Sequence, residues 1–113
     1  MKDDKLYLIH ISECIGRIEQ YFPDRSKHTF LSSTLLQDAV LRNLQTMAES
    51  TQRLSDSLKA KYPEVNWHKI SGFRNLLVHD YLGVDAERVW KIIEIDLPTL
   101  KQTINTMLSD YSK

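Results

Sequence analysis

The sequence predicts an all-α fold, an up-and-down bundle of about five helices that forms a single domain over residues 1–113. Apolar residues recur three and four positions apart from one end of the chain to the other, which is the helical period. Only three glycines and three prolines interrupt the chain, and runs of β-branched residues are few. Short polar connections separate the periodic segments, without a repeat or a long linker, so one helical core accounts for the whole length.

The first predicted helix runs from about Asp3 and stops before Pro23, because a residue that precedes proline disfavours the helical conformation. Its apolar face comprises Leu8, Ile11, Ile15, Ile18 and Phe22. A polar connection follows, in which Ser26 or Thr29 can cap the next helix. That second helix is predicted to be the longest and to end near Lys61. Its apolar face comprises Leu36, Val40, Leu44, Met47, Thr51, Leu54 and Leu58.

Three further helices are predicted in the second half of the chain. Asn66 is the expected N-cap of the third, which ends at Gly83. Its apolar face comprises Trp67, Ile70, Phe73 and Leu77. Asp85 is expected to cap a fourth helix over residues 86–95, and a fifth helix begins at about Pro98, a residue that suits a first helical turn.

Charge and cysteine content exclude several classes of protein. The chain carries 15 basic and 15 acidic residues, so any contact with nucleic acid must be local and not a property of the whole surface. A single cysteine, Cys14, rules out an internal disulfide and a multi-cysteine zinc site. His10 and Glu13 interrupt the apolar residues near the N-terminus, so no signal peptide or membrane span is readable. We expect a cytoplasmic protein that needs no metal and no cofactor.

The stretch "FRNLLVHDY", residues 73–81, contains three chemically capable side chains, Arg74, His79 and Tyr81. On a regular helix Arg74 and Tyr81 share a face, whereas His79 points roughly 140° away from Arg74. Under one interpretation these are separate surface residues of an amphipathic helix. Under the other, the helix frays or tightens before Gly83, and the side chains meet in one cleft.

The second interpretation fits cleavage of RNA without a metal. Such a reaction needs a base for the 2′-hydroxyl, an acid for the leaving 5′-oxygen and a fixed cation for the charge on the phosphorane. His79 can transfer protons near neutral pH, and the fork-shaped donors of Arg74 match phosphate oxygens. Asn75 could hydrogen-bond the scissile phosphate or hold His79. One histidine does not easily serve as both acid and base, whereas a dimer with two motifs across one cleft supplies both.

The segment "RNLLVHDY" resembles the Arg-x4-His-x-Tyr signature of HEPN-domain toxins, specifically the HepT-like family. Three longer segments resemble this family in the expected order and cover more than half of the chain. They are "DAVLRNLQTMAES" (38–50), "YPEVNWHKISGFRNLLVHDY" (62–81) and "VDAERVWKIIEIDLPTL" (84–100).

This resemblance implies a HEPN-like homodimer that acts as a metal-independent ribonuclease, the toxin of a type VII toxin–antitoxin pair with tRNA or mRNA as substrate. Arg74 would bind the phosphate and stabilise the transition state, and His79 would transfer the proton. Tyr81 would lie in the cleft and accept AMP from a minimal nucleotidyltransferase antitoxin, whose phosphate and bulk would block the substrate. Asn75 matches the polar residue that often follows the arginine. HEPN domains also include non-catalytic modules that bind a nucleotide or scaffold a nucleotidyltransferase.

Asp38 has two interpretations. It lies four residues before Arg42, the spacing of a weak surface ion pair. Alternatively, it orients Arg74 from the long helix that would face the motif. The second interpretation is favoured because Asp38 is a polar residue among apolar neighbours, and such residues generally find a partner.

Overall fold

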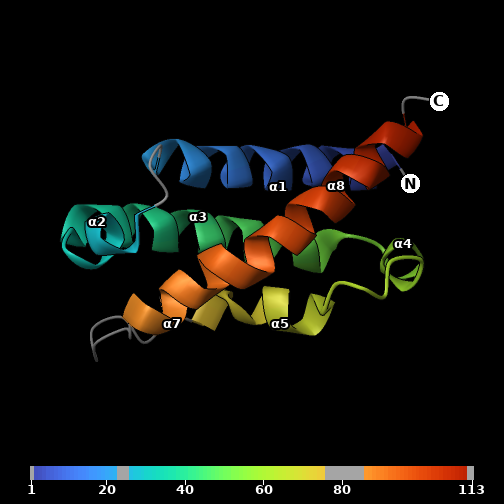
Figure 1. Cartoon of the computed structure of the whole chain (residues 1–113). Coiled ribbons are helices and arrows are strands. Elements are labelled where there is room, and N and C mark those ends of the chain that lie inside the picture. Colours follow the sequence, from blue (N-terminus) through green and yellow to red (C-terminus); the bar gives the residue numbers. More distant parts are fainter. Residues whose placement is uncertain (1, 23–25, 76–85, 112–113) are drawn as a thin grey trace.

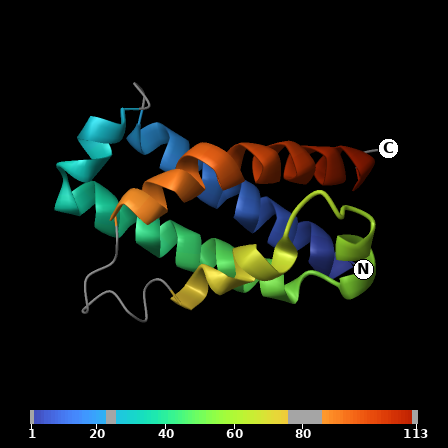
Figure 2. The same cartoon turned by 60° about the horizontal axis from the view of Figure 1, so that its bottom comes forward.

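The computed structural model describes residues 2–22, 26–75 and 86–111, and every regular element in these ranges is helical. Three long helices form the body of the bundle: α1 (Lys2–Tyr21), α3 (Thr34–Arg53) and α8 (Leu97–Tyr111). Helix α1 packs along α3, and α8 crosses in front of both (Figure 1). The first and last described residues lie at the same end of the molecule (Figures 1 and 2). The all-α bundle predicted from the periodicity is confirmed.

The predicted first helix is confirmed as α1, and its five expected apolar residues are all buried. The connection after it is not wholly irregular, because it contains a short helix, α2 (Lys27–Leu31). Ser26 caps α2, since its hydroxyl oxygen accepts a hydrogen bond from the Thr29 N–H at 3.1 Å. Ser33 caps α3 in the same way, because its hydroxyl oxygen accepts from the Leu36 N–H. Both helices therefore begin at a serine that satisfies an otherwise free backbone donor.

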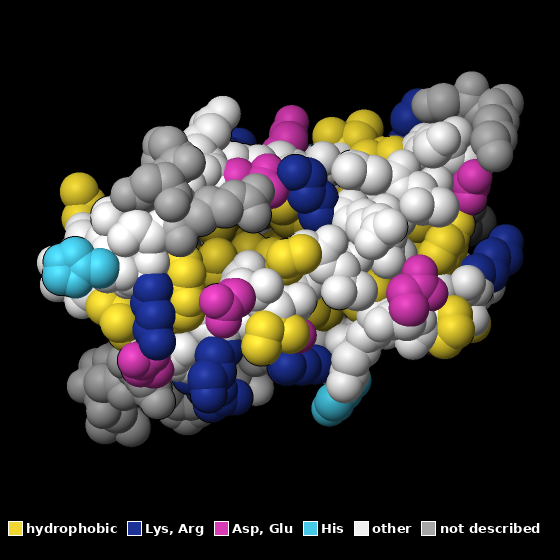
Figure 3. Space-filling model, viewed as in Figure 1, with side chains coloured by type: hydrophobic (Ala, Val, Ile, Leu, Met, Phe, Trp, Pro, Cys, Tyr) yellow, Lys and Arg dark blue, Asp and Glu magenta, His cyan; other side chains and the backbone are white. Residues whose placement is uncertain are grey.

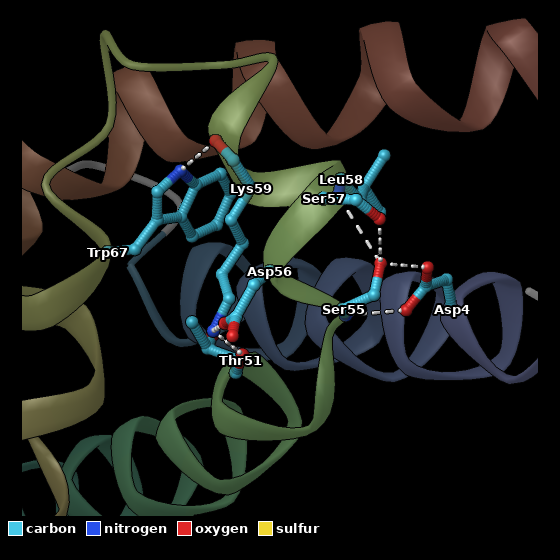
Figure 4. A network of polar contacts seen from close by, with 8 residues as sticks. All are labelled: Asp4, Thr51, Ser55, Asp56, Ser57, Leu58, Lys59 and Trp67. Atoms are coloured by element: carbon cyan, nitrogen blue, oxygen red, sulfur yellow. Dashed lines mark hydrogen bonds and ion pairs between the residues drawn. The ribbon is translucent and has the colours of Figure 1, made fainter.

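The prediction of one long helix to Lys61 is wrong. Helix α3 ends at Arg53, Leu54 is extended with φ −66° and ψ 143°, and a separate short helix, α4 (Asp56–Ala60), follows. Ser55 caps α4 by accepting from the Leu58 N–H at 3.3 Å. The buried carboxylate of Asp4 holds this cap in place (Figure 4), because it accepts from the Ser55 N–H at 2.8 Å and from the Ser55 hydroxyl at 2.7 Å.

The last two predicted helices are joined without a break. Helix α7 (Ala86–Lys91) passes into a π-helical turn, η2 (Ile92–Asp96), and then into α8. The Leu97 N–H donates to the Ile92 carbonyl, five residues back. Pro98 explains the wider turn, because it has no N–H for the Glu94 carbonyl and its ring clashes with that carbonyl in a regular helix. The predicted cap at Asp85 lies outside the described residues.

The hydrophobic core fills the space between α1, α3 and the continuous segment formed by α7, η2 and α8. Its fully buried apolar side chains include Leu8, Ile11, Ile18, Val40, Leu44, Met47, Leu100, Ile104 and Met107. Phe22, Phe30 and Trp90 form an aromatic cluster with ring centroids 5.6–5.9 Å apart, which ties together the ends of α1, α2 and α7. Within the described ranges, no helix is long and apolar enough to cross a membrane.

Replacing Asp4 by alanine tests the cap on α4. The Asp4→Ala variant leaves the Ser55 donors without their partner, so we expect the free energy of unfolding to fall by about 1.5–3 kcal/mol, the range for hydrogen bonds to charged groups. Urea unfolding measures this change. Asp3→Ala is the matched control, because Asp3 is an exposed carboxylate in the same helical turn. Equal losses in the two variants would show that the Ser55 contacts add nothing to stability.

Candidate functional site

Arg74 and Asn75 follow the short helix α5 (Trp67–Gly72), whose start is anchored on α4. The predicted N-cap is confirmed, because Asn66 Oδ1 accepts from the Lys69 N–H at 3.0 Å. The Trp67 indole N–H donates to two backbone carbonyls, those of Lys59 at 3.1 Å and Tyr62 at 3.0 Å. Figure 4 shows this indole turned back toward the end of α4. The start of α5, which leads to Arg74, is therefore held in place by these three hydrogen bonds.

The rest of α5 is held on both sides. Ile70 and Phe73 are buried in the core. Lys69 Nζ lies 3.1 Å from Asp96 Oδ1 and connects α5 to η2, although a partly exposed ion pair adds at most about 1 kcal/mol. The predicted helix is regular as far as Gly72. At Phe73 the backbone N–H donates three residues back, to Ile70, before residues 74 and 75 become helical again.

The Arg74 side chain is exposed and contacts the last turn of α3. Its Nη1 donates to Gln52 Oε1 at 3.4 Å. Among the residues that the structure describes, no carboxylate lies within ion-pair distance of this guanidinium. Asn75 is exposed beside it. The arrangement presents a cation and an amide to solvent, with the guanidinium charge not compensated by a described acid.

Asp38 is exposed near the start of α3, 14 residues before Gln52. That separation corresponds to about 21 Å of helix rise, so the structure does not bring Asp38 within hydrogen-bond reach of Arg74 in the same chain. Asp38 and Arg42 are both exposed and form no ion pair with each other. Two predicted site residues, His79 and Tyr81, lie outside the described residues.

Sequence reasoning did not single out Gln52. The available signal was a row of polar residues at helical spacing along one side of α3, which could have indicated Gln52 as a neighbour of the motif. The row comprises Asp38, Arg42, Gln45, Glu49 and Gln52. Which of these polar residues meets the motif depends on how α5 packs against α3, and local spacing carries no information on that packing.

A model of the family described as "Ribonuclease HepT-like" matches residues 11–107 of the chain, a range that contains Arg74, Asn75, His79 and Tyr81. The chain belongs to the HepT-like ribonuclease family. It is similar to "Probable ribonuclease HepT" of Thermococcus cleftensis, with 33% identity over 88% of this chain and 91% of that protein. It is also similar to "mRNA nuclease HepT" of Shewanella oneidensis, with 27% identity over 88% of this chain and 92% of that protein.

A longer relative matches almost the whole chain. The protein of Methanocaldococcus jannaschii named "Gamma-glutamylcyclotransferase and putative RNase" is 35% identical over 99% of this HepT-like chain. The chain spans only half the length of that relative. No solved structure matches the chain.

A concave region lies apart from Arg74. A cavity of about 470 Å³ opens between the end of α1 and the η2–α8 turn, over an apolar floor that includes Phe22 and Trp90. The Glu19–Lys101 ion pair, 2.9 Å long, lies at its edge. Hydrophobic side chains are visible in this hollow (Figure 3). None of its lining residues belongs to α3 or α5, so the cavity is separate from the contact between Arg74 and Gln52.

The described residues contain no group of three histidine, cysteine or acidic side chains that could hold a metal ion. Cys14 is buried, and burial raises the pKa of its thiol, so little of the nucleophilic thiolate forms near neutral pH. The buried Cys14 is therefore a poor nucleophile.

Thiol labelling tests the placement of Cys14. At pH 8 we expect iodoacetamide to modify the native protein at least about tenfold more slowly than the urea-unfolded chain, because burial hinders access and the raised pKa lowers the thiolate fraction. Mass spectrometry follows the reaction, and the single cysteine makes the product unambiguous. Equal rates in the two states would contradict a buried Cys14.

Proposed function

We propose that this chain is a metal-independent ribonuclease, in which Arg74 and His79 carry out attack of a 2′-hydroxyl on the adjacent phosphate. One observation carries the proposal: a HepT-like ribonuclease chain presents the arginine of its motif to solvent at the end of α5. No described acid neutralises that arginine, so its positive charge is available to a phosphate.

Arg74 binds the scissile phosphate and stabilises the additional negative charge of the phosphorane, because its parallel N–H groups match two phosphate oxygens. His79 transfers the proton, since the ordinary pKa of histidine, about 6.5, suits both acceptance and donation near neutral pH. Asn75, exposed beside Arg74, hydrogen-bonds the phosphate or holds His79.

The acting unit is a homodimer with the two motifs facing one cleft. Cleavage requires a base and an acid in the same reaction, and two copies of His79 supply both groups. Asp38 does not reach Arg74 of its own chain. In this dimer Asp38 therefore orients either the RNA substrate or a residue of the second protomer.

The proposed regulator is a minimal nucleotidyltransferase antitoxin that attaches AMP to Tyr81, which lies two residues after His79. The attached phosphate brings negative charge and bulk to the place where an RNA phosphate must bind. The chain is then the toxin of a toxin–antitoxin pair that acts on cytoplasmic RNA, tRNA or mRNA.

Cleavage of total RNA in EDTA tests the activity. We expect the wild type to cut RNA, and His79→Ala and Arg74→Ala each to lower the rate by about 100-fold or more, the usual contribution of a general acid–base or an electrostatic group. Arg17→Ala is the matched control, because it removes an exposed arginine from α1 and leaves the motif intact. Gel electrophoresis and sequencing of the products give the rate and the cut sites.

Two outcomes would contradict the proposal. If an unmodified wild type, shown by mass spectrometry to carry no AMP, leaves every RNA intact, the chain is a binding module and not a nuclease. If folded dimers of both motif variants cut as fast as Arg17→Ala, the activity resides outside the motif.

A further inference from the structure

The contact between Arg74 and Gln52 joins the candidate site to the last turn of α3. Gln52 is the last residue but one of α3, whose end is set by the buried Leu54 and the Ser55 cap. The guanidinium of Arg74 reaches this last turn and donates one N–H to the Gln52 side-chain oxygen at 3.4 Å. A cation is also favoured there by the partial negative charge at the end of a helix.

The chemical nature of Gln52 suits an arginine that must bind a phosphate. An amide oxygen is a neutral acceptor, so it occupies one of the five N–H donors of the guanidinium and leaves the full positive charge in place. A carboxylate at the same position would form a stronger, charge-assisted bond. It would also compensate the charge, and the phosphate would then have to compete with it.

We propose that Gln52 is a positioning residue for Arg74, which fixes the orientation of the guanidinium without neutralising its charge. The inference rests on the proposed ribonuclease function, in which Arg74 binds the scissile phosphate. Gln52 itself does not touch the reacting atoms. It acts by keeping the remaining N–H groups of Arg74 directed away from α3 and available to substrate.

A purely structural role for the same contact makes the opposite prediction for one substitution. If the hydrogen bond only attaches α5 to α3, then Gln52→Glu should serve as well as glutamine or better, because the bond gains charge assistance. If the bond positions a phosphate-binding cation, then Gln52→Glu should impair RNA binding and cleavage in a protein that is equally stable. This substitution nearly conserves the shape of the side chain, so it separates the two roles.

The experiment compares Gln52→Glu, Gln52→Ala and the control Gln20→Glu, which introduces the same charge at an exposed position of α1. Stability is measured by urea unfolding, and cleavage of total RNA is measured in EDTA. For Gln52→Glu we expect unchanged or higher stability and cleavage slower by about tenfold or more. For Gln52→Ala we expect a loss of about two- to tenfold, the range for one typical hydrogen bond, because the bond is exposed and long although its donor is charged. Gln20→Glu should match the wild type.

A binding assay supplies a measure that does not depend on cleavage. The probe is a pool of random-sequence single-stranded RNA with 2′-O-methyl groups, which lacks the attacking hydroxyl. Each phosphate contact adds about 0.7 to the slope of log affinity against log salt for a single strand. Gln52→Glu and Arg74→Ala should each lower the magnitude of this slope by about 0.7, whereas Gln52→Ala should leave it unchanged because the guanidinium keeps its charge.

The outcomes distinguish failure of this inference from failure of the proposed function. If the wild type cuts RNA and Gln52→Glu equals Gln20→Glu in rate and in salt slope, the positioning role is overturned and the ribonuclease stands. If the wild type binds the probe but cuts nothing, the ribonuclease proposal fails. Weaker binding of the probe by Gln52→Ala then still supports the positioning of Arg74, and equal binding overturns it. A wild type that neither cuts RNA nor binds the probe overturns both.

Discussion

The buried carboxylate of Asp4 determines where the chain turns. It accepts from the backbone N–H and the hydroxyl of Ser55, and it thereby ends α3 at Arg53 and begins α4. This early end allows α5 to run back beside α3, with Trp67 bonded to the end of α4 and Arg74 beside Gln52. Had α3 continued to Lys61, the chain would have turned about 12 Å further along the helix axis, and Arg74 would not reach Gln52.

Periodicity predicted the helices that depend on local information and failed where the deciding contact is distant. The apolar face of α1 and the Asn66 cap of α5 were both readable, since each involves residues within a few positions of one another. The end of α3 was not, because Leu54 and Leu58 continue the apolar stripe through the break. The residue that stabilises the break, Asp4, lies 51 positions away in the sequence.

The candidate site likewise contains residues that a local pattern identifies and a contact that depends on distant packing. Arg74 and Asn75 were predictable because the motif is a short local pattern, and the structure places them together and exposed. The contact of Gln52 with Arg74 was not predictable, since it depends on the packing of α5 against α3. Asp38 looked like a residue in need of a partner, but on the helix it faces solvent with other polar residues of α3. Neighbours in sequence proved a poor guide to neighbours in space for this side chain.

The surroundings of Arg74 bear on how a chain with no net charge would bind RNA at the motif in the proposed function. Three described lysines form close ion pairs with acids: Lys27 with Glu87, Lys69 with Asp96 and Lys101 with Glu19. Such pairs cancel at a distance, particularly in salt with a Debye length of about 8–10 Å. Arg74 meets an amide instead, so its field is not cancelled by its described partner. In the proposed function this charge binds the phosphate, and a change from amide to carboxylate at Gln52 would weaken that attraction by placing a negative charge beside the guanidinium.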